Sequence, residues 1–215
     1  MNQAASLPGD AMLNIEQRRK PVQDRSRERV ELILNESASL IMEVGVQGAK
    51  TSEIARRANI SLASLYRYFP NKSAIVKALA ERHMEKLSKV LGEFAGELDT
   101  DNGFDQLIDN YAMFYRSEPG YKEIWSGVEA MPELQELDLG ELFDNAHIIA
   151  ENAGKVYTSV DKDRLWLMCV MITRICANTM RLAMTLESDQ EEIMLSELKM
   201  MIKLYLKNRI AQPSD

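Results

Sequence analysis

The chain has 215 residues and a formal net charge of −7, a length that accommodates one large domain or a small domain joined to a medium one. Apolar residues make up 46% of the chain, enough for a sizeable core, and only 10 glycines and 6 prolines favour helices over sheet. The negative net charge, taken alone, argues against a nucleic-acid partner.

The first predicted elements are a flexible basic arm, residues 1–24, and a helix that follows it. Apolar side chains then recur with helical spacing as far as Gly45, a natural helix end. Thr51 is expected to cap a short second helix, and Ser61 a short third one. Asn59 lies between these two helices, where a tight turn needs a residue that tolerates positive φ.

A long fourth helix is expected over 72–94, and Asn71 is its predicted cap. Breaks at 99–103, 119–120 and 138–140 separate the later helices. We therefore expect an all-α fold of about nine helices with no strand. The later helices are predicted at 104–117, 121–128, 142–156, 161–186 and 188–205.

The segment 51–69 has the pattern of two short helices that cross closely. Ala55 and Ala58 are small enough for a close crossing, and the other inward positions are apolar. Such a pair presents its second helix outward, sized for the major groove of DNA, with its N-terminal end toward the base edges. The sequence therefore predicts a helix-turn-helix.

Several side chains of the second helix are expected to face DNA. Leu62 and Ala63 suit contacts with thymine methyl groups, while Ser64 and two tyrosine hydroxyls suit phosphates or bases. Lys72, at the start of the next helix, suits a phosphate. The alternative is that the aromatic side chains belong to the core, and we adopt this interpretation for Phe69.

The charge distribution agrees with a DNA-facing first part. Residues 1–86 contain 14 Lys and Arg against 10 Asp and Glu, whereas residues 87–215 contain 12 against 23. The alternative is a chance asymmetry of solvated surfaces. A basic cluster at 18–29 suits either a DNA-contacting arm or a solvated helix start, and acidic neighbours dilute its charge. Arg56 and Arg57 could also touch the DNA backbone.

These motifs resemble the TetR family of repressors over residues 27–85. The resemblance departs from the family pattern at Asn59, where the family usually has glycine, and asparagine tolerates the same backbone. The matching positions are Gly45, Thr51, Ile54, Ala55, Ala58, the run Ser61 to Phe69 with its ending Leu65-Tyr66-Arg67-Tyr68-Phe69, and Asn71-Lys72.

The resemblance implies roles for the helix-turn-helix side chains. Thr51 and Tyr66 should clamp phosphates with help from Tyr68 and Lys72, while the start of the second helix should approach the bases. The candidate DNA contacts are Thr51, Ser61, Leu62, Ala63, Ser64, Tyr66, Arg67, Tyr68 and Lys72.

The resemblance also implies a C-terminal helical bundle, residues 73–215, for effector binding and dimerisation, after a helix-turn-helix domain at 25–72. The segment from Leu165 to Leu186 is apolar nearly all round, which suits a dimer interface. A symmetric dimer implies a palindromic operator in double-stranded DNA. For each pocket candidate, ordinary core packing is the alternative to lining a site for a small apolar or aromatic effector. These candidates are Tyr111, Phe114, Tyr115, Trp125, Phe143, His147, Met168 and Arg174.

No spacing in the chain predicts a disulfide, a metal site or a catalytic centre. Cys169 and Cys176 lie about two turns apart on one helix, too far for a disulfide, and suit buried reduced thiols or, alternatively, a redox sensor. His83 and His147 do not complete a zinc site. We expect no metal, no cofactor and no catalytic residues, because phosphate-loop and nucleophile motifs are also missing from the sequence.

A membrane partner is not expected. Residues 1–12 lack the apolar region of a signal peptide. The most apolar stretch is long enough to span a membrane but carries Arg174, Asn178 and Arg181, so a helix buried in a bundle or dimer explains it better. We expect a cytoplasmic transcription regulator, a ligand-released repressor. The alternative is an architectural or cell-division DNA-binding protein of the same fold without an effector.

Overall fold

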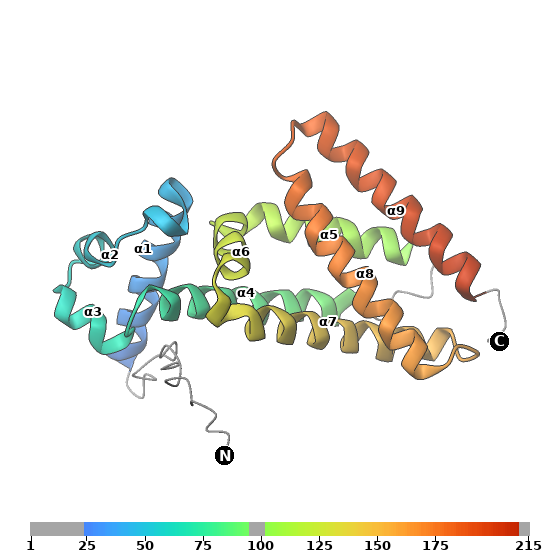
Figure 1. Cartoon of the computed structure of the whole chain (residues 1–215), viewed down its shortest axis with the longest axis horizontal. Helices are drawn as coiled ribbons and strands as arrows, with labels where there is room; N and C mark the ends of the chain where they lie inside the picture. The colour runs from blue at the N-terminus through green and yellow to red at the C-terminus, as the bar shows by residue number, and fades with distance from the viewer. Residues whose placement is uncertain (1–23, 95–101, 211–215) are drawn as a thin grey trace, which may run out of the picture.

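The computed structural model describes residues 24–94 and 102–210, and within these ranges it contains nine α-helices, one short 3-10 turn and no strand (Figure 1). The predicted all-α fold is confirmed. The arm predicted at 1–24 lies outside the described residues except for its last one. The elements are α1 (Asp24–Gly48), α2 (Thr51–Arg57), α3 (Leu62–Tyr68), α4 (Lys72–Phe94), α5 (Gly103–Ser117), α6 (Tyr121–Ala130), the turn η2 (Pro132–Leu134), α7 (Gln135–Val156), α8 (Lys162–Ala183) and α9 (Ser188–Ile210).

Helices α1, α2 and α3 form a small group at one end of the molecule, and α5 to α9 form a larger bundle (Figure 1). The core of the small group is fully buried and comes from all three helices, through Ile33, Ile54 and Leu65. Helix α4 begins against this group, where Ile75 is buried, and continues into the bundle beside α7. It therefore connects the two parts as one continuous rod.

A second connection joins α6 of the bundle to α1, and two glycines permit it. A Cβ atom added at Gly127 would lie 2.5 Å from Cγ2 of Val46 on α1. Gly120 has a φ of +70°, and a Cβ there would lie 3.3 Å from the carbonyl oxygen of Ala38. Side chains at these positions would push α6 away from α1, so the glycines set the distance between the small group and the bundle.

Helix α8 packs against α7 on one side and α9 on the other. By length and composition it is the one helix among the described residues that could cross a membrane. Its neighbours cover part of its apolar surface, including Leu165, Cys169 and Ile172. This packing identifies α8 as a helix of the bundle.

Two details of the predicted elements are wrong. The break expected at 138–140 lies inside α7, where Asp138 accepts two hydrogen bonds from Arg174 on α8. This pairing between helices holds a polar stretch in helical form. In addition, Lys50 is the residue that precedes α2, and Thr51 is the first residue of that helix. The hydroxyl of Thr51 is free of a capping role because it bonds to Tyr66 instead.

Candidate nucleic-acid interface and ligand-binding core

Helices α2 and α3 cross closely because small side chains lie at their contact. Ala55 and Ala58 are buried there. Asn59, in the turn, has a φ of 50°, in the left-handed region that asparagine tolerates better than most residues. The backbone N–H of Ile60 donates to the carbonyl oxygen of Ala55 at 3.0 Å and closes the turn. The turn expected at Asn59 is confirmed.

The outer face of α3 is open to solvent. Ser61 accepts a hydrogen bond from the backbone N–H of Ser64 at 3.1 Å, which confirms it as the helix cap. Leu62 and Ala63 follow it and are exposed. Arg67, one turn later, donates to the hydroxyl of Ser64 at 3.1 Å. The helix thus presents short side chains at its N-terminal end, the end that enters the major groove in helix-turn-helix proteins.

A concave surface, which we call the cradle, lies between the start of α2, the side of α3 and the start of α4. Thr51 Oγ1 and Tyr66 Oη are 3.0 Å apart and form a hydrogen bond at this surface. Lys50, Asn71 and Lys72 also border it. Two lysines and two hydroxyls around one hollow are groups of the kind that proteins use to bind a phosphate.

Lys72 also stabilises the fold. Its Nζ atom donates to the carbonyl oxygens of Val46 at 2.7 Å and of Gln47 at 3.2 Å, in the last turn of α1. The backbone kinks at Gly45, where φ is 69°, so these carbonyls belong to the short turn after the kink, and Lys72 satisfies them. Lys72 therefore ties the start of α4 to the end of α1 while its charge stays at the edge of the cradle.

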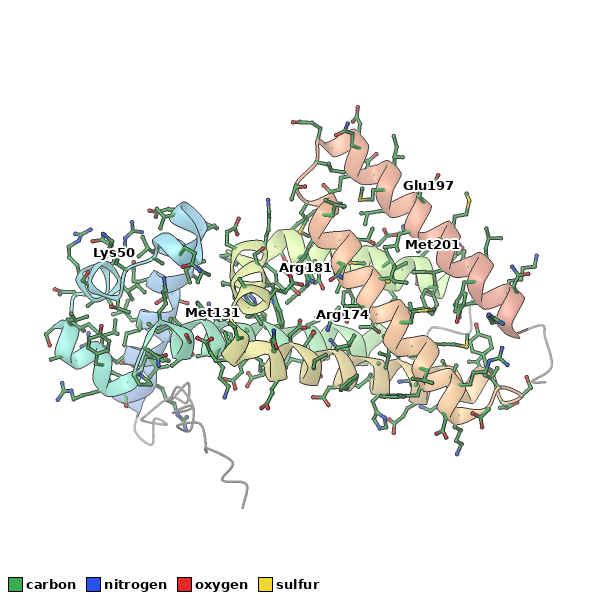
Figure 2. All side chains as sticks on the ribbon, viewed as in Figure 1. Lys50, Met131, Arg174, Arg181, Glu197 and Met201 are labelled. Carbon is green, nitrogen blue, oxygen red and sulfur yellow. The ribbon has the colours of Figure 1, made fainter. Side chains whose placement is uncertain are left out.

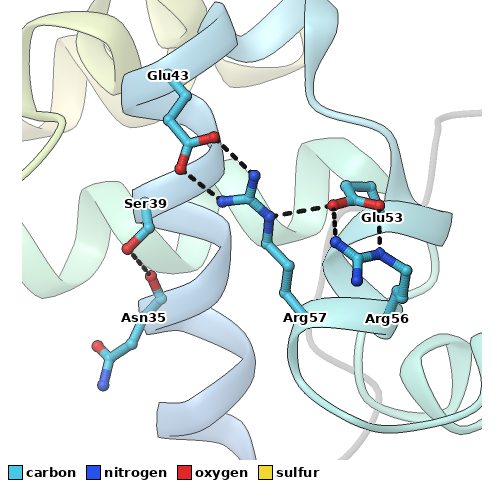
Figure 3. A network of polar contacts seen from close by, with 6 residues as sticks. All are labelled: Asn35, Ser39, Glu43, Glu53, Arg56 and Arg57. Atoms are coloured by element: carbon cyan, nitrogen blue, oxygen red, sulfur yellow. Dashed lines mark hydrogen bonds and ion pairs between the residues drawn. The ribbon is translucent and has the colours of Figure 1, made fainter.

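Arg57 ties α2 to α1 (Figure 3). Its guanidinium group donates to both carboxylate oxygens of Glu43, each at 2.6 Å, and to Glu53 at 3.2 Å. Glu53 also accepts from Arg56, at 2.7 and 2.8 Å. The hydrogen bonds from Arg56 and Arg57 lower the pKa of Glu53 to about 2, because they favour its ionised form. The guanidinium group of Arg57 is thus bonded to carboxylates within the protein.

Three further residues of this region differ in how well the sequence predicts their surroundings. Tyr68 is half-buried and packs against the core, and Phe69 is fully buried, as expected. Lys50 has no periodic signal of its own, and its place in the cradle becomes evident only from the structure. The available clue was its position directly before Thr51, the first residue of the motif.

Three cavities follow one another through the bundle, and we name them by their linings. The terminal cavity is bordered by Phe104, Ile149, Ala153, Tyr157, Leu165, Met168, Cys169, Ile172 and Leu206. The apolar cavity is bordered by Phe104, Leu107, Ile108, Tyr111, Ile149, Ile172, Thr173, Cys176 and Met180. The acidic cavity is bordered by Tyr111, Tyr115, Asp138, Glu141, Leu142, Asn145, Thr173, Arg174, Ala177 and Arg181.

Four of the eight predicted pocket residues border these cavities. Tyr111 and Tyr115 are buried, with ring centroids 5.8 Å apart, and Phe114 and Trp125 are buried in the same aromatic cluster. Met168 borders the terminal cavity. Arg174 borders the acidic cavity from α8 (Figure 2).

Phe143 and His147 lie on a different face of α7. Phe143 is 42% exposed and contacts Trp166, with ring centroids 5.8 Å apart. The side chain of His147 is 67% exposed and lies 3.3 Å from Glu151. The helical register turns both away from the buried face of α7, which carries Asn145. The structure therefore does not bring these two candidates together with the others.

Two family models match the chain. The model described as "Bacterial regulatory proteins, tetR family" matches residues 33–79, which contain the helix-turn-helix. The model described as "Tetracyclin repressor-like, C-terminal domain" matches residues 98–210, more than half of the chain. The chain belongs to the TetR family. This TetR-family protein is therefore a DNA-binding regulator, and α2 and α3 are its helix-turn-helix.

Individual relatives of this TetR-family protein match only part of the chain. The nucleoid occlusion factor SlmA of Haemophilus influenzae is 28% identical over 130 residues, which cover 59% of this chain and 58% of that protein. The uncharacterized HTH-type transcriptional regulator YvkB of Bacillus subtilis is 35% identical over 69 residues, 32% of this chain and 36% of that protein. The matched stretch thus spans little more than half of the Haemophilus relative.

A solved structure extends the likeness over nearly the whole fold. A TetR-family transcriptional regulator from Pectobacterium atrosepticum superimposes with a TM-score of 0.68, covering 90% of this chain and 100% of that one. The two sequences are only 14% identical. The shared feature is therefore the fold, including the bundle that follows the helix-turn-helix.

Proposed function

We propose that this TetR-family regulator is a ligand-released repressor that binds a palindromic operator as a homodimer. The observation that carries the proposal is the connection of the exposed face of α3 to a bundle with internal cavities, through α4 and the α1–α6 contact. In this proposal residues 25–72 bind DNA, and residues 73–215 bind the effector and form the dimer. The protein acts in the cytoplasm, where its operator is accessible.

The proposed DNA contacts divide by position. Leu62, Ala63 and Ser64 approach base edges from the start of α3. Thr51 and Tyr66, held together by their hydrogen bond, contact a phosphate at the cradle. The remaining proposed contacts are Ser61, Arg67, Tyr68 and Lys72, with Lys50 added from the geometry of the cradle.

The proposed dimer interface is the outer surface of α8 and α9. Large apolar side chains are exposed there, Met201 among them (Figure 2). Exposed apolar surface of this extent favours association, because burying it removes it from water. These residues are Leu167, Met171, Leu182, Ile193, Met200, Met201 and Leu204, each at least 40% exposed.

Release by an effector requires that the bundle and the small group move together. Helix α4 and the contact of Gly127 with Val46 supply two fixed connections between them. A ligand that binds better to a bundle with spread helices would change the distance between the two recognition helices of the dimer. The operator would then no longer fit both.

Footprinting on the DNA that flanks the protein's own gene tests this function. We expect protection of a two-fold-symmetric site whose half-sites lie about 34–36 Å apart. Ala63→Glu, which places a negative charge at the base-facing end of α3, should abolish the footprint. If no genomic fragment is protected by the unaltered protein, operator binding is refuted.

A second candidate function is supported by the likeness to SlmA, which is described as a nucleoid occlusion factor. A protein of that kind would bind DNA in an architectural or cell-division role without an effector. A genome-wide map of binding sites separates the two functions. One or a few sites near genes favour the repressor, whereas many scattered sites that no small molecule releases favour the alternative.

A further inference from the structure

Two hydroxyl groups in the middle of the bundle have no hydrogen-bond partner among the described residues. They are Tyr111 Oη and Thr173 Oγ1, on side chains that are each 7% exposed. Both residues border the apolar cavity on one side and the acidic cavity on the other. An unsatisfied buried hydroxyl costs about 1–3 kcal/mol. Two of them in one wall indicate a place where a bound molecule supplies the missing partner.

The acidic cavity also holds an imbalance of charge. Both arginines that border it are already paired, Arg174 with Asp138 at 2.8 and 3.3 Å and Arg181 with Glu129 (Figure 2 shows both arginines on α8). Their positive charges are therefore matched by carboxylates other than Glu141. This leaves Glu141 as the carboxylate of the cavity that bonds to neither arginine, although both lower its pKa through space.

Glu141 has one hydrogen-bonding neighbour, the side-chain amide of Asn145, and forms no ion pair within residues 24–94 and 102–210. Burial is the largest of the effects that raise its pKa, to about 7. A partly buried carboxylate whose neighbouring cations are bonded to other carboxylates is stabilised further by a cation placed directly beside it. The acidic cavity, where Glu141 lies, therefore favours the binding of a positively charged group.

The apolar cavity and the terminal cavity favour the binding of an apolar group. The apolar cavity and the terminal cavity share Phe104, Ile149 and Ile172, so the two are consecutive. Their linings are almost entirely hydrocarbon and sulfur. A molecule that begins beside Glu141 and extends past Tyr111 would thus meet mostly apolar side chains along the rest of its length, with Thr173 and Tyr157 as the exceptions.

We propose, on the basis of the ligand-released function above, that the effector is an elongated amphiphile with an ammonium head. The head lies beside Glu141, and a hydrocarbon tail extends through the apolar cavity toward the terminal cavity. The hydroxyls of Tyr111 and Thr173 accept hydrogen bonds from the N–H groups of the head. The phenol rings of Tyr111 and Tyr115 border the same cavity and favour a cation near their faces.

The size of the cavities links this ligand to release. The apolar cavity has a volume of about 30 Å³, and the acidic one about 10 Å³, space for about one water molecule each. A hydrocarbon tail cannot enter without moving side chains such as Met180 and spreading α5, α7 and α8. The bound state therefore differs in helix spacing from the state described here, which is the condition for a population shift.

Isothermal titration calorimetry of the full chain without DNA tests the proposal. The probes are decylamine, decanol and decanoate below their micellar concentrations, since they share one tail and differ in head charge. At about pH 8, above the pKa of Glu141, decylamine should bind on the order of tenfold more tightly than either of the others. Equal binding of decanol, or tighter binding of decanoate, overturns the proposal.

Three variants sharpen the test. Glu141→Gln should abolish the preference for decylamine over decanol, whereas Glu151→Gln, an exposed glutamate of the same helix, should leave it unchanged. Thr173→Val keeps nearly the same side-chain shape. It should weaken the binding of decylamine and affect the binding of decanol less. An unchanged preference in Glu141→Gln refutes the role of that carboxylate. These measurements contain no DNA, so failure of operator binding or release in the footprint is recorded separately from failure of the ligand class.

Discussion

Side chains that we propose to contact DNA also form hydrogen bonds within the protein. The hydrogen bond between Thr51 and Tyr66 orients the phenol of Tyr66, which is 37% exposed at the cradle. Lys72 bonds the carbonyls at the end of α1. Because these contacts hold the side chains before DNA arrives, little conformational entropy remains to be lost when a phosphate binds.

Tyr66→Phe tests the phosphate role at this scale. Loss of one hydroxyl contact should weaken DNA binding by about 1 kcal/mol, about fivefold. Because a phosphate contact carries little sequence information, operator and unrelated DNA should be affected alike. Fluorescence anisotropy with both DNAs over a range of salt concentrations measures this. A change in base preference would contradict the assignment.

Glu141 gives a pH dependence of stability with a defined sign. Its pKa in the folded protein, about 7, lies above the ordinary glutamate value of 4.5, so the folded state favours the protonated form. Its contribution to stability is present below pH 4.5 and is lost as the pH rises through 7. Glu141→Gln should therefore be more stable than the unaltered protein at about pH 8, by at most about 3 kcal/mol, and equal to it near pH 4.5.

Urea unfolding of both proteins at several pH values measures this difference. Other carboxylates with shifted pKa values, such as that of Glu53, are common to both proteins and cancel in the comparison. A difference in unfolding free energy that does not change with pH would contradict the assigned cause.

At the scale of elements, helix contacts connect the two parts of the molecule. The approach of α6 to α1 depends on Gly127 beside Val46, and α4 runs from one part into the other. Arg57 holds α2 against α1 through Glu43 (Figure 3). The recognition helix is thus positioned by contacts that also reach the bundle.

Gly127→Ala tests the α1–α6 contact. The added Cβ would lie 2.5 Å from Val46, so we expect a loss of about 1–3 kcal/mol of unfolding free energy despite the better helix propensity of alanine. Val46→Ala removes both Cγ atoms, including the one at 2.5 Å, so the double variant should lose less than the two single variants together. Urea unfolding of the four proteins measures the coupling, and strictly additive effects would contradict a direct contact.

At the scale of the whole molecule, the exposed apolar surface of α8 and α9 predicts a dimer. Leu204→Glu places a charge on this surface and should shift the protein toward monomer in sedimentation velocity experiments. Met113→Glu is the matched control, because Met113 is 60% exposed on α5, outside the proposed interface. Equal behaviour of the two variants would place the interface elsewhere. Loss of the dimer should also weaken binding to a palindromic operator, since both half-sites are no longer held together.

The sequence by itself determined the all-α class, the helix-turn-helix and its boundaries near α3. Ser61, Asn59 and Asn71 act on the backbone within a few residues, so their effects are readable locally. The helical repeat of apolar residues likewise depends only on neighbours in the chain.

Only the tertiary structure decided which polar side chains are paired. Arg57 bonds to Glu43 on α1, and Arg174 bonds to Asp138 on α7 rather than to Glu141. The register of α7 places Phe143 outside while it places Glu141 at a cavity. Such pairings depend on the distance and rotation between helices far apart in sequence, which no local pattern encodes.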